Sequence, residues 1–141
     1  YQHRKDSELA IESYKRALEL QGNDPDVMVS LAVSYLRVKR FESARQVLEN
    51  VLEIEPDNNP AYRYLGYYYI RMNDFEGALE NYLMATQFEE RDWNSHKGLG
   101  VAYMLRSINN DDDEARVNAI DHWKTSLAIN PRQPKLRELL K

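Results

Sequence analysis

Three histidines are the residues of this sequence that could ligate a transition metal, since imidazole nitrogen is a common zinc ligand. His3, His96 and His122 are far apart in the chain and form no closely spaced ligand pair. There is no cysteine, which excludes thiolate metal sites, disulfides and cysteine nucleophiles. A metal site would need distant segments to converge on these histidines. We therefore expect His96 to occupy a packing position and His122 to precede the core residue Trp123.

An acidic run after Ser107 could bind calcium, which prefers carboxylate and amide oxygens. Residues 107–114 read Ser-Ile-Asn-Asn-Asp-Asp-Asp-Glu, without the alternating spacing or the distant bidentate glutamate of a calcium loop. We expect instead an extended loop in which Asp112 or Asp113 caps the next helix, where negative charge is favourable. Calcium binding by this loop stays open as the alternative interpretation.

The remaining candidate for chemistry is the fragment Gly98-Leu99-Gly100, which is part of a nucleotide-loop pattern. We expect it inside a helix, with Gly100 as a small packing residue. The nucleophile elbow G-x-S-x-G and the Gly-rich phosphate loop do not occur in the sequence. We therefore predict that the chain is not an enzyme by itself and uses no cofactor and no metal.

Charge and hydropathy exclude two further classes of protein. The 141 residues include 19 Lys plus Arg and 23 Asp plus Glu, a net charge of −4, whereas nucleic-acid-binding domains are usually basic. No run of apolar residues is long enough to predict a membrane-spanning segment. The sequence begins at Tyr1 without a targeting leader, which leaves the compartment open and slightly favours the cytoplasm. Its 5 Gly and 5 Pro allow few tight turns, which favours long helices.

The elements that carry these residues recur every 34 residues. This step relates a set of tyrosines, Tyr1, Tyr35, Tyr69 and Tyr103. It also relates a leucine and the small residue after it, at Leu31-Ala32, Leu65-Gly66 and Leu99-Gly100. A second series consists of alanines, Ala10, Ala44 and Ala78. A fixed period of this length indicates a repeat architecture.

Packing explains this pattern of small and large residues. Small residues let two antiparallel helices approach closely, and large ones fill the layer between repeats. Asp24 is a plausible N-cap, and Pro25 and Pro60 suit first turns, where the missing N–H costs nothing. The sequence predicts helices at residues 7–20, 25–38, 41–54, 59–72, 75–89, 93–106, 114–129 and 134–141.

These recurring residues resemble the tetratricopeptide repeat (TPR), a 34-residue helix–turn–helix unit. The resemblance implies an all-α fold, a right-handed α-solenoid of antiparallel helix pairs with a concave face formed by the first helix of each pair. Departures are local: Gly22 and Glu90 stand where proline is usual, and His96 replaces a bulky residue. The resemblance divides the chain into a partial repeat, mainly its second helix (1–24), two repeats (25–58 and 59–92), a repeat with a seven-residue loop insertion (93–133), and a capping helix or the start of a further repeat (134–141).

The family's concave groove maps onto defined positions of this chain. The resemblance implies a peptide groove with a continuous apolar strip and an excess of positive charge, so we expect a peptide or helix with apolar and acidic side chains. Residues matching a chaperone-tail clamp are of the wrong type, so no such tail is expected there. The candidate groove residues are Val29, Val33, Leu36, Arg37, Arg63, Tyr64, Tyr67, Ile70, Arg71, Lys97, Val101 and Met104.

The expected function is a non-catalytic scaffold for protein–protein interaction. The alternatives are a regulatory or substrate-docking arm of a larger enzyme, or a self-assembling oligomer joined through the incomplete N-terminal repeat. One helix of a pair cannot bury its face alone, so we expect either more chain upstream or another molecule to cover this edge. The groove could also be filled by the protein's own N-terminal segment or by another subunit. Neither nucleic acid nor membrane insertion is expected.

Overall fold

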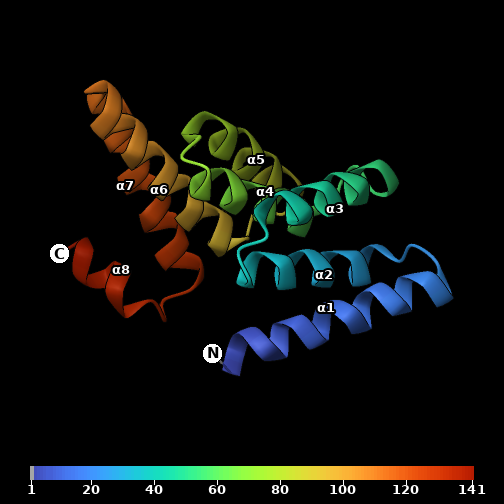
Figure 1. Cartoon of the computed structure of the whole chain (residues 1–141). Coiled ribbons are helices and arrows are strands. Elements are labelled where there is room, and N and C mark those ends of the chain that lie inside the picture. Colours follow the sequence, from blue (N-terminus) through green and yellow to red (C-terminus); the bar gives the residue numbers. More distant parts are fainter. Residues whose placement is uncertain (1) are drawn as a thin grey trace.

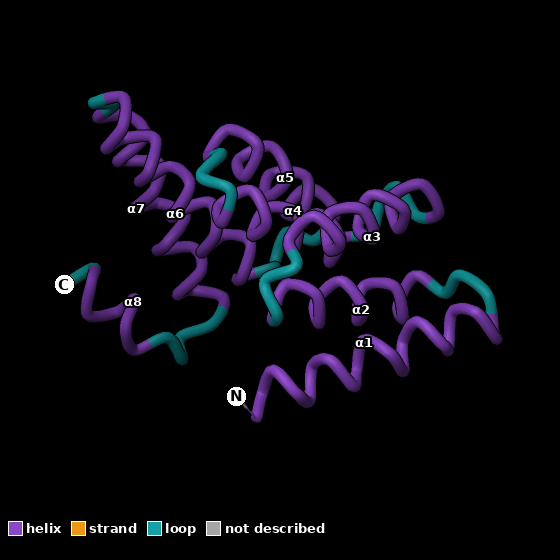
Figure 2. The backbone as a smooth tube through the Cα atoms, viewed as in Figure 1, coloured by secondary structure: helices purple, strands orange, loops and turns teal. Residues whose placement is uncertain are grey.

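The structure, a computed structural model, describes residues 2–141 and consists there of helices joined by short connections (Figures 1 and 2). No strand occurs within this range, so the expected all-α fold is confirmed. None of its helices combines the length and apolar composition needed to cross a bilayer. The helices are α1 (Gln2–Gln21), α2 (Pro25–Arg37), α3 (Phe41–Ile54), α4 (Asn59–Arg71), α5 (Phe75–Phe88), α6 (Trp93–Asn110), α7 (Asp113–Ile129) and α8 (Pro134–Leu139).

The helices pack as antiparallel pairs, α2 with α3, α4 with α5 and α6 with α7. The first helices of the pairs, α2, α4 and α6, also touch one another in sequence order. By contrast, the second helices contact only the first helix of the next pair: α3 contacts α4, and α5 contacts α6. Figure 1 shows the resulting stack, which advances from α1 to α7, with α8 standing apart at the end. The first helices therefore form one continuous layer and the second helices lie behind it.

Short polar side chains fix where most helices begin. Asp24, Asn58, Asp74, Asp92 and Asp112 each accept a hydrogen bond from a backbone N–H two or three residues further on. Such bonds satisfy donors that have no partner inside the helix. The expected caps at Asp24 and Asp112 are confirmed, and Pro25 and Pro60 lie in first turns.

The repeated small and large residues form the seams between helices. Ala32, Gly66 and Gly100 are buried at equivalent positions. A β-carbon added at Gly66 would lie 2.8 Å from the ring of Tyr82, and one at Gly100 would overlap the indole of Trp123. The small residues therefore leave the space that these two rings occupy, as the periodic pattern predicts.

The N-terminal helix corrects one expectation. We expected the second helix of a partial repeat to begin near residue 7, after a turn, but α1 is continuous from Gln2 to Gln21. The corresponding turns of later repeats use left-handed residues, Lys39 and Asn73. In α1 the equivalent Lys5 is helical, and the helical hydrogen bonds of α1 satisfy the backbone there. Tyr1 lies outside the described residues.

The seven-residue insertion corrects a second expectation, because it does not form an extended loop. Helix α6 has 18 residues and α7 has 17, against 13 in α2 and α4 and 14 in α3 and α5. Only Asp111 and Asp112 separate the two helices, and Asp111 is left-handed with φ 52°. The inserted residues thus lengthen both helices, and the last pair projects beyond the others (Figure 1).

The C-terminal helix α8 is shorter than expected and ends at Leu139. Leu136 is buried in this helix, whereas Leu139 is 62% exposed. The physical reason is the contact partner: α8 packs only against α7, and a single neighbour can cover only one side of a helix this short.

Candidate peptide-binding groove

A concavity of about 250 Å³ lies on the layer of first helices. Its lining comes from α2, α4 and α6, with a single residue from α5. Six of the candidate groove residues meet there, and two residues outside that set, Tyr82 and Asn94, complete it. The lining residues are Val33, Leu36, Arg37, Arg63, Tyr64, Tyr67, Tyr82 and Asn94.

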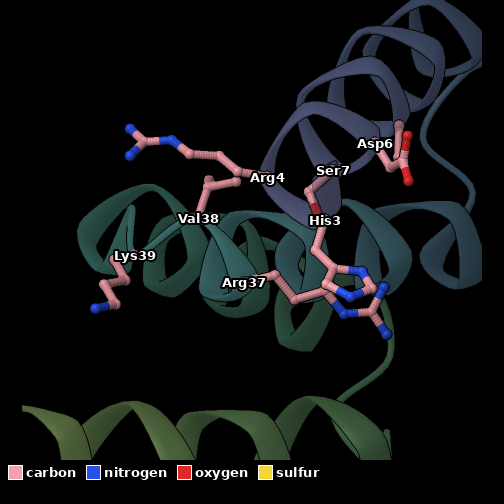
Figure 3. A pocket seen from close by; sticks show the side chains of 8 residues that line it. His3, Arg4, Asp6, Ser7, Arg37, Val38 and Lys39 are labelled. Carbon is pink, nitrogen blue, oxygen red and sulfur yellow. The ribbon is translucent and has the colours of Figure 1, made fainter. Parts of the chain in front are cut away.

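Arg37 joins this concavity to two neighbouring hollows. One is lined by Val29, Tyr14 and other residues of α1, α2 and α4, which places a seventh candidate residue beside the groove. The other lies between the start of α1 and the end of α2 and includes His3. In Figure 3 the side chains of His3 and Arg37 extend to the same side of that hollow, whereas Arg4 and Lys39 point away from them. Arg37 is therefore the cation shared by all three hollows.

The other five candidate residues lie outside the concavity. Ile70 packs against the core around Tyr82, and the guanidinium of Arg71 lies 5.7 Å from the centre of the Phe41 ring. The remaining three, Lys97, Val101 and Met104, are on α6, where Lys97 is exposed and the two apolar side chains are half-buried. The structure thus does not bring all twelve candidates into one hollow.

Arg63 lines the concavity, but its charge is paired. Its Nη1 lies 3.2 Å from Oδ2 of Asp92, a carboxylate that is only 6% exposed. The same oxygen accepts hydrogen bonds from Asn59 Nδ2 at 2.9 Å and Ser95 Oγ at 2.6 Å. Asp92 therefore ties α4 to the start of α6, and Arg63 balances its charge.

Burial alone would raise the pKa of Asp92. The hydrogen bonds from Ser95 and Asn59 and the charge of Arg63 outweigh burial, so the pKa of this carboxyl lies below its usual range. Asp92 is accordingly ionised in the folded protein. Of the arginines lining the concavity, Arg37 is the one that makes no ion pair with another described residue.

Tyr82 is a lining residue of the concavity that the sequence did not place among the candidates. It occupies a second-helix position, and such positions face the seams. Its ring nevertheless reaches the inner layer because Gly66 and Gly98 leave room on α4 and α6. Gly98 lies two residues before Gly100, the expected small position of that repeat. This extra glycine was the signal in the sequence that could have indicated the space for the Tyr82 ring.

The structure brings two of the histidines together from separate helices, His96 from α6 and His122 from α7. His96 Nδ1 and His122 Nδ1 are 3.1 Å apart, and the ring of His122 stacks on Tyr103. Burial and the neighbouring His96 lower the pKa of His122, and Asp121 opposes this effect. Among residues 3–141, however, no group of three His, Cys, Asp or Glu side chains could hold a metal ion.

Comparison with known proteins places this architecture in a family. A sequence model of the tetratricopeptide repeat matches residues 3–66, and the helix pairs described above have the spacing of that unit. The chain contains tetratricopeptide repeats.

Two curated relatives of this TPR chain are subunits of larger complexes. It is 26% identical over 140 residues to the anaphase-promoting complex subunit CDC16 of Saccharomyces cerevisiae, which covers 94% of the chain and 16% of that protein. It is 27% identical over 126 residues to the BBSome complex member BBS4 of Bos taurus, which covers 89% of the chain and 23% of that protein. The chain thus spans less than a quarter of either relative.

A solved structure shares the TPR fold. The crystal structure of YrrB, a TPR protein with an unusual peptide-binding site, superposes with a TM-score of 0.76 over 96% of this chain and 66% of that chain. The two sequences are 16% identical, so this likeness concerns the fold.

Removing the charge of Arg63 should destabilise the protein. Arg63→Met leaves the buried Asp92 without its counter-charge, and we expect a loss of about 1–3 kcal/mol in unfolding free energy at pH 7. Arg37→Met, on the same concavity but without an ion pair, is the matched control and should change stability little. Urea unfolding measures both. Equal stability of the two variants would contradict the assigned role of Arg63.

The histidine pair should make stability depend on pH. Well above about pH 6.5, His122 is neutral in both the folded and the unfolded protein. As the pH falls, the unfolded chain binds the proton first, because its histidine has the higher pKa. The free energy of unfolding therefore decreases until the pH passes the lowered pKa of the folded state. We expect the urea midpoint to fall between pH 7.5 and 5 and His122→Gln to reduce this fall. His3→Gln, at an exposed site, should leave it intact. An unchanged pH dependence in His122→Gln would refute this assignment.

Proposed function

We propose that this TPR segment binds an extended or helical segment of another protein in the concavity of α2, α4 and α6. The apolar side chains of the bound segment contact the lining of the concavity, and its acidic side chains lie near Arg37. The observation that carries the proposal is the combination of an apolar and aromatic hollow with one unpaired cation at its rim. Arg63, which the sequence suggested as a second free cation, is already balanced by Asp92.

The size of the hollow supports a peptide over a small-molecule ligand. At about 250 Å³ it is smaller than the pockets that enclose drug-sized ligands, roughly 300–1,000 Å³. It fits one or two side chains of a longer segment. Tyr67 is 42% exposed at this site, and a rigid aromatic ring that becomes buried on binding is typical of an interface anchor.

The charge near Arg37 supports acidic side chains in the partner. The hollow between α1 and α2 is lined by Arg4, Arg37 and Lys39 against the single carboxylate of Asp6. This local excess of positive charge contrasts with the net charge of −4 of the chain. An arginine such as Arg37, which makes no ion pair with another described residue, can form bidentate hydrogen bonds with a carboxylate.

The comparisons support a protein partner in general terms. CDC16 and BBS4 are named as members of complexes, and YrrB is described as having a peptide-binding site. The chain spans only part of CDC16 and BBS4, and we propose for it the role of a protein-contact module without catalytic activity of its own.

Selection from a phage-displayed random peptide library tests this proposal. Peptides enriched on the wild-type chain should combine apolar residues with Asp or Glu, and Tyr67→Ala should weaken their binding about tenfold or more because an anchoring ring is lost. Arg37→Glu should weaken the acidic peptides through charge reversal. Fluorescence anisotropy measures the affinities.

Two control variants lie outside the concavity. Phe88→Ala removes a ring that is equally exposed, at 42%, from the end of α5, and Arg116→Glu reverses an exposed charge on α7. Both should bind the enriched peptides like the wild type. Enriched peptides that bind Tyr67→Ala with unchanged affinity would overturn the proposed site.

A further inference from the structure

Tyr82 crosses from the outer layer of helices to the inner one. It belongs to α5, yet it lines the concavity, while the other lining residues belong to α2, α4 and α6. The residue is only 6% exposed. Most of its ring is therefore enclosed in the seam, and what remains accessible faces the concavity.

Two glycines determine how the ring lies. A β-carbon at Gly66 on α4 would lie 2.8 Å from Cδ1, Cδ2 and Cε1 of Tyr82. A β-carbon at Gly98 on α6 would overlap Cζ, the ring atom that bears the hydroxyl. The base of the ring thus rests on α4 and its tip on α6. Tyr82 passes between these two helices, with its hydroxyl end beside α6.

The hydroxyl of Tyr82 has no hydrogen-bond partner among the described residues. The fully buried side-chain atoms that lack a partner are Nε of Arg63, Nε of Arg106 and Oε1 of Gln133, so the Tyr82 oxygen is not sealed inside the protein. Burial raises the pKa of Tyr82, which keeps the hydroxyl protonated. A buried tyrosine hydroxyl usually finds a partner, and here the open side is the groove.

The charges around this hydroxyl favour a neutral acceptor. Asp92 and Arg63, whose charges both act on Tyr82, are paired with each other, so Arg63 offers no free positive charge to a carboxylate. Asn94, exposed on the rim of the same concavity, carries both an amide donor and a carbonyl acceptor. A hydroxyl donor beside a side-chain amide complements the C=O and N–H of a peptide group.

We propose that Tyr82 Oη donates a hydrogen bond to a main-chain carbonyl of the segment bound in the concavity, and that Asn94 pairs with the neighbouring peptide group. This inference rests on the proposed function and adds to it. The groove then recognises side chains at Arg37 and Tyr67 and the main chain at Tyr82. The bound segment is extended at this point, because inside a helix the single N–H of each peptide group is already used within the helix and could not pair with Asn94.

The variant Tyr82→Phe isolates the hydroxyl, since the ring that fills the space between Gly66 and Gly98 stays. With a peptide enriched on the wild-type chain as the probe, we expect about a five- to twentyfold loss of affinity, the effect of leaving one acceptor unsatisfied. Tyr62→Phe removes a hydroxyl that bonds Pro56 O outside the groove and should leave the affinity unchanged. Urea midpoints like that of the wild type confirm that both variants are folded.

Replacing single peptide bonds of the probe by esters identifies the acceptor. One ester, whose carbonyl accepts more weakly, should reduce affinity for the wild-type chain and not for Tyr82→Phe. If the loss in Tyr82→Phe instead disappears when an acidic side chain of the probe is changed to its amide, the acceptor is a carboxylate and the proposal is wrong.

The two proposals fail in different ways. If enriched peptides depend on Tyr67 but bind Tyr82→Phe as tightly as the wild type, the main-chain contact is overturned and the proposed function stands. If no enriched peptide depends on Tyr67, the proposed function fails and this inference fails with it.

Discussion

Each helix pair holds together because a small side chain on the first helix leaves room for a large one from the second. In the three pairs, the residue on the first helix is smaller where the side chain from the second helix is larger. Ala32 stands in the pair that contains Leu48, whereas glycine stands where the partner is a ring, Gly66 with Tyr82 and Gly100 with Trp123. Close packing leaves no spare volume in such seams, so the size of one residue restricts the other. The small and large residues that recur every 34 positions in the sequence reflect this restriction.

The same seams build the groove. Tyr82 fills the space between α4 and α6, and the tip of its ring therefore forms part of the lining of the concavity. Asp92, which caps α6, also forms the ion pair that holds Arg63 in place in that lining. Two residues of the concavity thus stabilise the helix stack as well. Arg37 and Tyr67, by contrast, are exposed, and Arg37 has no ion pair within the described chain. The side chains that hold the concavity in shape are thus partly distinct from Arg37 and Tyr67, which we propose as side-chain contacts of the partner.

Periodic features were predictable from the sequence, and features created by single side chains were not. The small and large positions, the cap at Asp24 and the helix pairs follow from local pattern. The pairing of Arg63 with Asp92 links residues 29 positions apart, and the contact of His96 with His122 depends on how two helices align. The register placed the insertion around residues 107–113, and its acidic residues suggested a loop, whereas the helical hydrogen bonds of α6 continue to Asn110.

The most direct test of the account is the unfolding free energy of Gly100→Ala. Helix propensity alone would make alanine more stable than glycine by up to about 1 kcal/mol. The overlap with the Trp123 indole predicts the opposite, a loss of about 1–3 kcal/mol, while Lys97→Ala on the exposed side of the same helix should change stability little. A Gly100→Ala protein as stable as the wild type, or more stable, would contradict the claim that matched residue sizes hold the helix pairs together.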